Sequence, residues 1–277
     1  MRLLVSPALL GDLECFIKNE CLTPWVKFIW QLNAENADFH YKLLPTDCID
    51  IVLNLKSDIV YETDSGKIVA PPFHINGLRS KPSFIRQNGD AFIFGISFHS
   101  YGLFPFVRKP LKCLQDEVVD LREMSLELEQ KFTSAVSGAN SEEIIKSIEH
   151  ALISELVADP NFLREVPLIN DYLTIADDVT VKDFCEQQAI NIKTFERKVL
   201  FYTGFTPKLL RNIKRFQMAS NQLSHQRITN LVEIAYNNNF TDQTHFIKDF
   251  RRFSGVAPRA FQMEKISVKE NVTYTYF

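Results

Sequence analysis

Two stretches in the C-terminal third of the sequence repeat each other, and this repeat constrains the fold more than any other feature. Residues 195–208 (FERKVLFYTGFTPK) and 246–259 (FIKDFRRFSGVAPR) align without a gap at an offset of 51. Phe, Gly and Pro coincide, and Thr203 and Ser254 form one of several close exchanges. A repeat of this kind indicates one supersecondary unit that is built twice.

Each copy carries the signals of a helix-turn-helix. A short amphipathic segment, VKDFCEQQ or LVEIAYNN, comes before it, and a Gly and then a Pro that opens the next helix end it. In this motif the second helix enters the major groove of DNA. We therefore predict a series of short helices, over residues 162–176, 180–188, 191–203, 207–224, 229–237, 241–253 and 258–265.

The predicted helix 241–253 has an apolar face and a polar face. With Thr241 or Asp242 as N-cap, the helical period places three phenylalanines on one side, which we expect to be buried: Phe246, Phe250 and Phe253. The opposite side is polar and basic, and it consists of Thr244, Lys248 and Arg251, with Gln243, Ile247 and Arg252 at its edges.

The polar face matches the chemistry of DNA. Gln pairs with adenine, Lys donates to guanine, and Thr and Ile methyl groups contact thymine, whereas arginines a turn further on would lie over phosphates. A solvated surface helix would show the same polar face. The repeat favours recognition, because two equal units would place two such helices in successive major grooves.

Charge is divided unevenly along the chain, whose net charge is -3. Residues 1–160 hold 15 Lys and Arg against 22 Asp and Glu, whereas residues 161–277 hold 16 against 12. Within residues 193–259 the ratio is 12 to 4. A local basic surplus of this kind is expected of a nucleic-acid surface.

The segment IAYNNNFTDQTHFIKDFRRFSGVAPRAF resembles the second helix-turn-helix signature of AraC/XylS-type transcription regulators. The matching positions are Ile234, Ala235, Phe240, Asp242, Phe246, Phe250, Gly255 and Pro258. The resemblance extends more weakly back to about residue 165. It implies an all-α DNA-binding domain with two helix-turn-helix units, which are joined by the helix at 207–223.

The resemblance also assigns residues to roles in DNA binding. The implied base-reading residues are Lys193, Glu196, Arg197, Gln243, Thr244, Ile247 and Lys248. The implied phosphate-contacting residues are Thr194, His245, Arg251, Arg252, Lys208 and Arg259. Two alternatives stay open: Glu196 reads a base or orients Arg197, and His245 packs in the unit or contacts phosphate.

The first unit departs from the family pattern at its turn and at the end of its recognition helix. Where the family has Gly in the turn, the second unit has Asn239, which tolerates the left-handed conformation, and the first has Ala189, which tolerates it less well. We therefore expect a slightly different first turn. Leu200 and Phe201 replace the arginines of the second unit, so we expect fewer phosphate contacts there.

The N-terminal half is predicted to be mostly β, because residues 23–98 contain short apolar runs separated by turn signals. After residue 110 the pattern becomes helical. The half resembles the N-terminal domain of one subgroup of AraC-like regulators, which implies a barrel or cupin-like domain. The predicted fold is α+β and multidomain, with a regulatory domain (1–135), a linker helix (136–160) and a DNA-binding domain (161–277).

A ligand pocket in the N-terminal domain is one interpretation of its aromatic residues, and an ordinary core is the other. These residues are Trp25, Trp30, Phe39, Tyr41, Phe92, Phe94 and Phe98. Arg79, Arg86 and His99 are the polar groups that such a pocket would use. The identity of a ligand does not follow from the sequence.

Catalysis is not predicted. His40, His74 and His99 lie in the β region without the spacing of a metal site, and Cys15 and Cys21 lack the partners of a DNA-repair zinc site. A metal-dependent or DNA-repair enzyme with an AraC-like module is the alternative function. The five cysteines, without paired spacing, suggest a reducing cytoplasm, and neither a leader peptide nor a membrane span is expected.

The sequence therefore predicts a cytoplasmic, bacterial-type transcription regulator that acts as an activator. Its expected partners are double-stranded DNA, RNA polymerase, a small-molecule effector and a second copy of the chain, with no cofactor and no metal. Control would pass from the N-terminal domain through the helix at 141–157, whose apolar stripe would pack on the barrel or on a second subunit.

Overall fold

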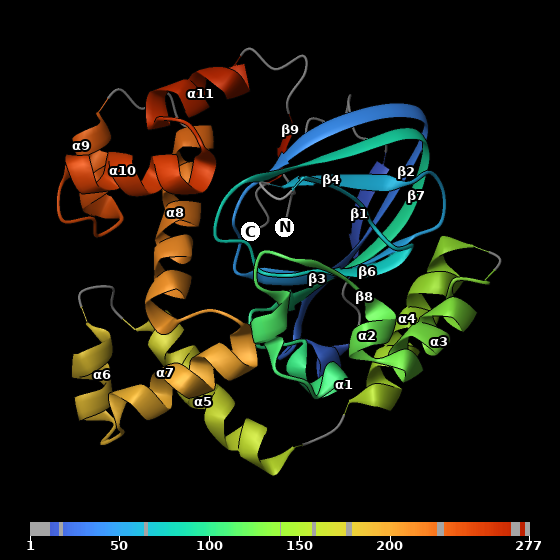
Figure 1. Cartoon of the computed structure of the whole chain (residues 1–277), viewed down its shortest axis with the longest axis horizontal. Helices are drawn as coiled ribbons and strands as arrows, with labels where there is room; N and C mark the ends of the chain where they lie inside the picture. Colours follow the sequence, from blue (N-terminus) through green and yellow to red (C-terminus); the bar gives the residue numbers. More distant parts are fainter. Residues whose placement is uncertain are drawn as a thin grey trace.

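A computed structural model of the chain consists of a curled β-sheet domain and a helical domain that lie side by side (Figure 1). The structure describes residues 12–16, 19–63, 66–138, 140–156, 159–175, 179–225, 230–266 and 272–274. In this part of the chain, no helix is both long enough and apolar enough to span a membrane.

The sheet is built around two long antiparallel strands, β2 (Val26–Leu43) and β7 (Ser83–His99), which pair along almost their whole length. Irregular pairing between Ala34 and Ala37 increases the local twist, so the sheet curls into a half-barrel. The strand order is β1-β2-β7-β3-β6-β8, with β4 also on β7, β5 on β4 and β9 on β2. The shorter strands are β1 (Asp12–Phe16), β3 (Cys48–Asn54), β4 (Ile59–Thr63), β5 (Gly66–Val69), β6 (Phe73–Asn76), β8 (Val118–Asp120) and β9 (Val272–Tyr274).

Both faces of the sheet centre are buried, and all seven residues of β3, CIDIVLN, are buried even though two of them are polar. One face, with Ile51 and Phe94, belongs to a large core that extends into the helices. The other face, with Val52 and Trp30, forms a second core inside the curl. Gly95 allows this packing, because a Cβ atom there would lie 1.9 Å from the indole of Trp30.

Short helices cover one end of the sheet: η1 (Glu20–Leu22), α1 (Phe104–Val107), η2 (Leu111–Leu114), α2 (Leu121–Met124), α3 (Leu126–Ala135) and α4 (Ser141–Glu155). The prediction of helix from residue 110 onward is wrong at Val118–Asp120, which pair with β6 as strand β8. Helix α4 packs against α3, and its apolar stripe, Ile145, Ile148 and Leu152, is buried within the chain.

The helical domain follows the predicted sequence of elements. Asp159 caps its first helix, accepting hydrogen bonds from the N–H groups of Asn161 (2.8 Å) and Phe162 (3.2 Å). Pro207 and Pro258 each occupy the first position of a helix. The helices are α5 (Pro160–Thr174), α6 (Val181–Gln187), α7 (Ile192–Thr203), α8 (Pro207–His225), α9 (Leu231–Asn237), α10 (Gln243–Ser254) and α11 (Pro258–Ile266).

An interdomain aromatic cluster joins the two domains, and it consists of Trp25, Phe104, Phe162, Phe201 and Tyr202. The ring of Phe104 lies 4.9 Å from that of Phe162 and 4.8 Å from that of Tyr202, and Trp25 lies 5.5 Å from Phe162 (centroid distances). Apolar burial of this kind stabilises the contact by about 25 cal/mol per Å². The domains therefore share one hydrophobic core.

The aromatic residues proposed for an N-terminal pocket have different environments. Trp30, Phe94 and Phe98 are buried core residues, and Phe92 packs partly buried against the same core. Trp25 contacts the helical domain. The side chains of Phe39 and Tyr41 lie outside the described residues.

The three polar groups proposed for the pocket do not share a site. Arg79 is buried and donates to Asn76 Oδ1 (2.7 Å) and to the carbonyl of Asp116 (3.1 Å). The half-exposed Arg86 pairs with Glu62 at 2.9 Å. His99 borders a pocket that lies between the domains.

Burial shifts the pKa values of two titratable groups in the sheet in opposite directions. Asp50 accepts a hydrogen bond from Ser97, and burial raises the pKa of its carboxyl group to about 6. Burial lowers the pKa of His74 to about 4. The His74 ring donates from Nδ1 to the carbonyl of Pro71 (2.8 Å), so its Nε2 accepts from the hydroxyl of Tyr61 (2.9 Å).

We expect Asp50→Asn to change how stability depends on pH. Folded Asp50 holds its proton up to about pH 6, whereas unfolded Asp releases it near 3.8, so its stabilising contribution is complete below 3.8 and is lost as pH rises to 6. The loss amounts to about 3 kcal/mol in total, roughly half of it above pH 5. Urea unfolding at pH 5 and pH 7.5 should therefore show Asp50→Asn gaining stability over the wild type as pH rises.

The difference in stability between the variant and the wild type does not include the contribution of His74, because both proteins contain this residue. The asparagine side chain of the variant keeps an oxygen that can accept the hydrogen bond of Ser97, so the substitution introduces no new unpaired donor on Ser97. Parallel pH profiles for the two proteins would contradict the expectation.

Candidate DNA-binding surface

The two turns of the repeated units have the same geometry. Ala189 and Asn239 both adopt the left-handed conformation, with φ of 52° and 54°. The N–H of the next residue closes each turn at 2.9 Å, from Ile190 to the carbonyl of Cys185 and from Phe240 to that of Ala235. The expectation of a different first turn is therefore wrong, because the surrounding hydrogen bonds hold Ala189 in a conformation that alanine by itself disfavours.

The recognition helices α7 and α10 also begin alike. Asn191 Oδ1 accepts from the N–H of Thr194 (3.2 Å), and Asp242 Oδ1 accepts from the N–H of His245 (2.7 Å). Asp242, rather than Thr241, is thus the cap of α10.

Their C-terminal ends are equally similar. Gly204 and Gly255 end the helices with φ of 82° and 78°. The preceding hydroxyls, Thr203 and Ser254, each donate to the carbonyl four residues earlier at 2.7 Å and accept from the N–H two residues later at 3.2 Å. Equivalent residues of the sequence repeat therefore make equivalent hydrogen bonds at the ends of both recognition helices.

Each recognition helix buries its apolar face as predicted. In α7 these residues are Phe195, Val199 and Tyr202, and in α10 they are Phe246, Phe250 and Phe253. Phe216 of α8 packs on α10, with its ring centroid 5.1 Å from that of Phe250. The polar face of each helix is consequently left on the surface.

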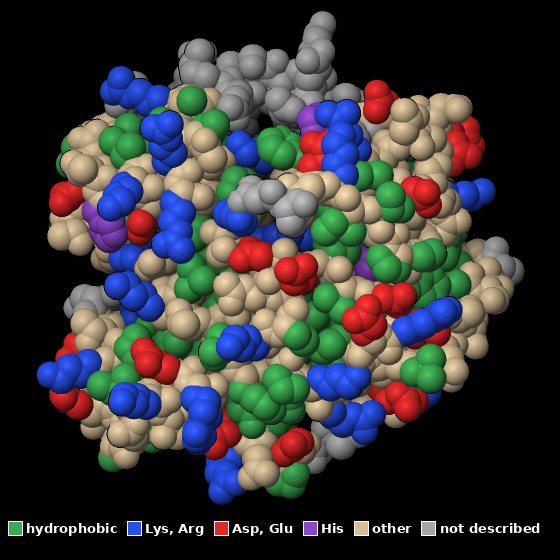
Figure 2. Space-filling model, in the orientation of Figure 1, with side chains coloured by type: hydrophobic (Ala, Val, Ile, Leu, Met, Phe, Trp, Pro, Cys, Tyr) green, Lys and Arg blue, Asp and Glu red, His purple; other side chains and the backbone are tan. Residues whose placement is uncertain are grey.

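The residues assigned to base reading lie on these outer faces. Lys193, Glu196, Arg197, Thr244 and Lys248 are exposed, whereas Gln243 and Ile247 are half-buried. Of the residues assigned to phosphate, Lys208, Arg251, Arg252 and Arg259 are exposed, and Thr194 and His245 are half-buried. Lys and Arg side chains predominate over the helical domain on the left of Figure 2.

Within the described part of residues 193–259, four basic side chains have ionic or hydrogen-bond partners inside the protein, so the basic surplus counted in the sequence overstates that of the surface. Lys198 pairs with Glu165 at 2.7 Å, and Lys214 donates to the carbonyl of Leu173 at 2.7 Å. Arg211 donates to the carbonyl of Val179, and Arg215 donates to that of Asn239 at 3.0 Å. The exposed cations that remain in the described part of residues 193–259 are those assigned to DNA.

Arg211 and Arg215 position the two units, a role that sequence reasoning missed. Arg211 lies over the ring of Tyr172 (5.0 Å) and reaches the carbonyl just before α6, whereas Arg215 lies over Phe240 (5.1 Å) and reaches the turn residue of the second unit. Their spacing of four residues on α8 was visible in the sequence, but their carbonyl partners were not.

The structure shows the surroundings of His245 and Glu196, whose roles the sequence left open. His245 lies with its Nε2 3.2 Å from Asp249 Oδ2 and its ring edge against Phe240 (5.8 Å), so it is engaged within the unit. No ion pair joins Glu196 to Arg197 in the described part of the chain.

The end of α7 packs on the N-terminal domain, which explains its apolar residues. Phe201 is 40% exposed, and its ring lies 5.6 Å from that of Phe104. A Cβ atom on Gly204 would lie 2.7 Å from the carbonyl oxygen of Leu111. A Cβ atom on Gly255, at the end of α10, would lie 3.4 Å from Lys42 Nζ. Both recognition helices therefore direct their C-terminal ends toward the N-terminal domain.

Comparison with known families identifies both domains. Residues 184–264 match the family described as a helix-turn-helix domain, and residues 18–120 match a domain of unknown function, DUF6597. The chain thus carries an AraC-type helix-turn-helix domain at its C-terminal end, behind a DUF6597 domain.

Similar proteins include the HTH-type transcriptional activator RhaS of Escherichia coli strain SE11, which is 33% identical over 84 residues. This match covers 30% of the chain and 30% of the length of that relative. Among solved structures, ToxT of Vibrio cholerae O395 aligns over 87% of this chain and 97% of its own, with 13% identity and a TM-score of 0.43. A dual regulator of Escherichia coli K-12 aligns over 38% and 91%, with 19% identity and a TM-score of 0.30.

We expect Ala189→Gly to stabilise the protein by about 0.5–1 kcal/mol, because glycine adopts the left-handed conformation without the steric cost that alanine bears there. The side chain of Ala189 is exposed, so the substitution creates no cavity. Thermal unfolding would measure the change. Ala189→Val, which adds β-branching at the same φ, should lower the melting temperature, and a rise with valine would contradict this account.

Proposed function

We propose that the protein is a sequence-specific, DNA-binding transcription regulator that reads two adjacent segments of the major groove with α7 and α10. The observation that carries the proposal is the close structural similarity of the two units in their turns, helix caps and buried faces. Each unit also leaves the polar face of its recognition helix on the surface. The AraC-type domain family supports the same conclusion.

The spacing of the units is compatible with duplex DNA. Helix α8 connects them and spans 19 residues, which corresponds to roughly 28 Å at the α-helical rise. Successive major-groove segments on one side of B-form DNA lie about 34 Å apart. Since the C-terminal ends of α7 and α10 both face the N-terminal domain, their N-terminal residues are available on the side away from it.

Binding would proceed in two stages. The exposed cations, including Lys208, Arg251 and Arg259, would dock on phosphates, releasing counterions and setting the register. Lys193, Arg197, Thr244 and Lys248 would then contact base edges.

Regulation is assigned to the N-terminal domain, as a receptor for a small effector or as a dimerisation element. The domain division at residues 1–135, 136–160 and 161–277 remains part of this proposal, with α4 and the segment that follows it as the connection. The proposal includes activation together with RNA polymerase in the cytoplasm. The similarity to RhaS, a transcriptional activator, supports activation.

We expect Lys248→Ala and Arg251→Ala to weaken DNA binding in different ways. Loss of a base contact from Lys248 should relax preference at one base position and cost about 1–3 kcal/mol, whereas loss of a phosphate contact from Arg251 should weaken all sequences alike and reduce the salt slope by about one. Selection from a random duplex library, followed by affinity measurements at several salt concentrations, distinguishes the two effects.

Lys146→Ala is the matched control, because this exposed lysine lies on α4, where it pairs with Glu142 at 3.0 Å. It removes the same charge outside the recognition helices. Equal weakening of every sequence by Lys248→Ala would remove that residue from the base-reading set, and the absence of salt-dependent binding to any duplex would refute the proposed function.

A further inference from the structure

The two recognition helices carry different side chains at equivalent positions of their outer faces. Because the caps and C-terminal ends of α7 and α10 have the same geometry, side chains at an offset of 51 leave the two helices in the same direction. Three pairs of outer residues define the first, second and third reading positions: Lys193 and Thr244, Glu196 and Ile247, and Arg197 and Lys248. A difference in what the two helices recognise therefore comes from these side chains rather than from the backbone.

The third reading position has the same chemistry in both units. Arg197 and Lys248 are both exposed cations. Both residue types donate to the O6 and N7 acceptors of guanine, and Arg does so through two parallel hydrogen bonds. Each helix would contact one segment of the major groove, here called its box, and each box should contain one G·C pair at this position.

The second reading position differs most, because α7 has a carboxylate there. Glu196 is exposed, and in the part of the chain that the structure describes no ion pair joins it to Lys193 or Arg197. A carboxylate that enters the negative field of DNA needs a donor, because desolvating an unpaired charge is costly. Cytosine offers its N4 amino group, whereas thymine presents the acceptor O4 and a methyl group. Glu196 therefore favours cytosine and rejects thymine.

In α10 the same position is apolar. Ile247 is half-buried and packs against the hydrophobic core. Its β-branched side chain has little rotamer freedom, so its outer surface stays at this position. A thymine methyl group complements that surface, whereas the amino group of cytosine would lose its water without gaining a partner. Ile247 therefore favours thymine where its equivalent in α7 favours cytosine.

The first reading position repeats this contrast in a weaker form. Lys193 and Thr244 are both exposed. The ammonium group of Lys193 can donate to guanine, whereas the methyl group of Thr244 can contact thymine. The hydroxyl group of a threonine bonds to either kind of base edge, so the preference for thymine is less strict here.

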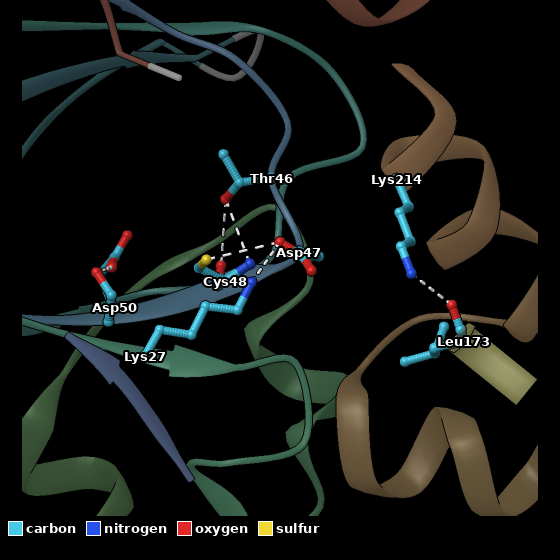
Figure 3. A network of polar contacts seen from close by, with 8 residues as sticks. Lys27, Thr46, Asp47, Cys48, Asp50, Leu173 and Lys214 are labelled. Carbon is cyan, nitrogen blue, oxygen red and sulfur yellow. Dashed lines mark hydrogen bonds and ion pairs between the residues drawn. The ribbon is translucent and has the colours of Figure 1, made fainter. Parts of the chain in front are cut away.

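The helix that connects the units directs three of its cations into the protein. Lys214 donates to the carbonyl of Leu173, 2.7 Å away, as Figure 3 shows. Arg211 and Arg215 also donate to main-chain carbonyls. These side chains of α8 therefore add no base preference to the DNA between the two boxes.

We propose that the DNA site of this protein is asymmetric in composition. The box of α7 has G·C pairs at all three reading positions, whereas the box of α10 has a G·C pair at the third position and A·T pairs at the first and second. The inference rests on the proposed function, because it requires both helices to enter the major groove. It deepens that function by assigning a class of base pair to each position.

Exchanges between equivalent residues test the proposal on the full chain. Selection from a random duplex library should give, for the wild type, two boxes of these compositions about one helical turn apart. Glu196→Ile should replace cytosine by thymine at one position of the G·C box, and the ratio of affinities for the two duplexes should change by about fivefold or more. Thr244→Lys should introduce a preference for guanine into the other box. Both side chains are exposed, so neither exchange alters the core.

Glu186→Ile is the matched control, because this exposed glutamate lies on α6, in the same unit as Glu196 but outside the recognition helix. It should leave the selected sequences unchanged. Two boxes of like composition for the wild type, or a preference for cytosine that persists in Glu196→Ile, would overturn the proposal. Loss of guanine at the third position without a gain of thymine at the second would also overturn it, by showing that Glu196 orients Arg197.

These outcomes are distinct from failure of the proposed function. Salt-dependent binding to duplexes of another composition would overturn the asymmetric site and leave the DNA-binding function standing. The absence of salt-dependent binding to any duplex would refute both.

Discussion

The packing of α8 between the two helix-turn-helix units is the interaction on which the DNA-binding geometry depends. Its buried side, with Leu210, Ile213 and Phe216, is common to the cores of both units. Its arginines add polar contacts, since Arg211 and Arg215 each bond a backbone carbonyl beside one unit. Close-packed interiors resist small displacements, so the two recognition helices are held at a defined separation.

The sequence predicted most of the helical domain because each helix carries its own signals. Asp159, Asn191 and Asp242 are caps whose side chains accept backbone N–H groups, and the observed helices begin and end within about two residues of the predicted ones. The apolar faces of α7 and α10 followed from the helical period alone. The outer faces followed from the same period, and the family resemblance then assigned their residues to roles in DNA binding.

What the sequence could not reveal depends on contacts between distant segments. Strand β8 forms because its backbone completes the edge of β6, which outweighs the helical pattern around it. Ala189 is left-handed because the rest of its turn requires it. The partners of Lys214 and Arg215 are main-chain carbonyls, which leave no mark on composition or spacing. The pocket between the domains arises only from how the domains are placed.

The aromatic cluster between the domains has a consequence for how this protein can be divided. Phe162, Phe201 and Tyr202 belong to the helical domain, yet they rest on Phe104 and Trp25 of the other one. A fragment cut at the loop before Pro160 would turn these rings toward water and would tend to self-associate. Grafting the helical domain onto a foreign receptor would therefore require polar replacements at this seam, or an acceptor surface shaped like the one it lost.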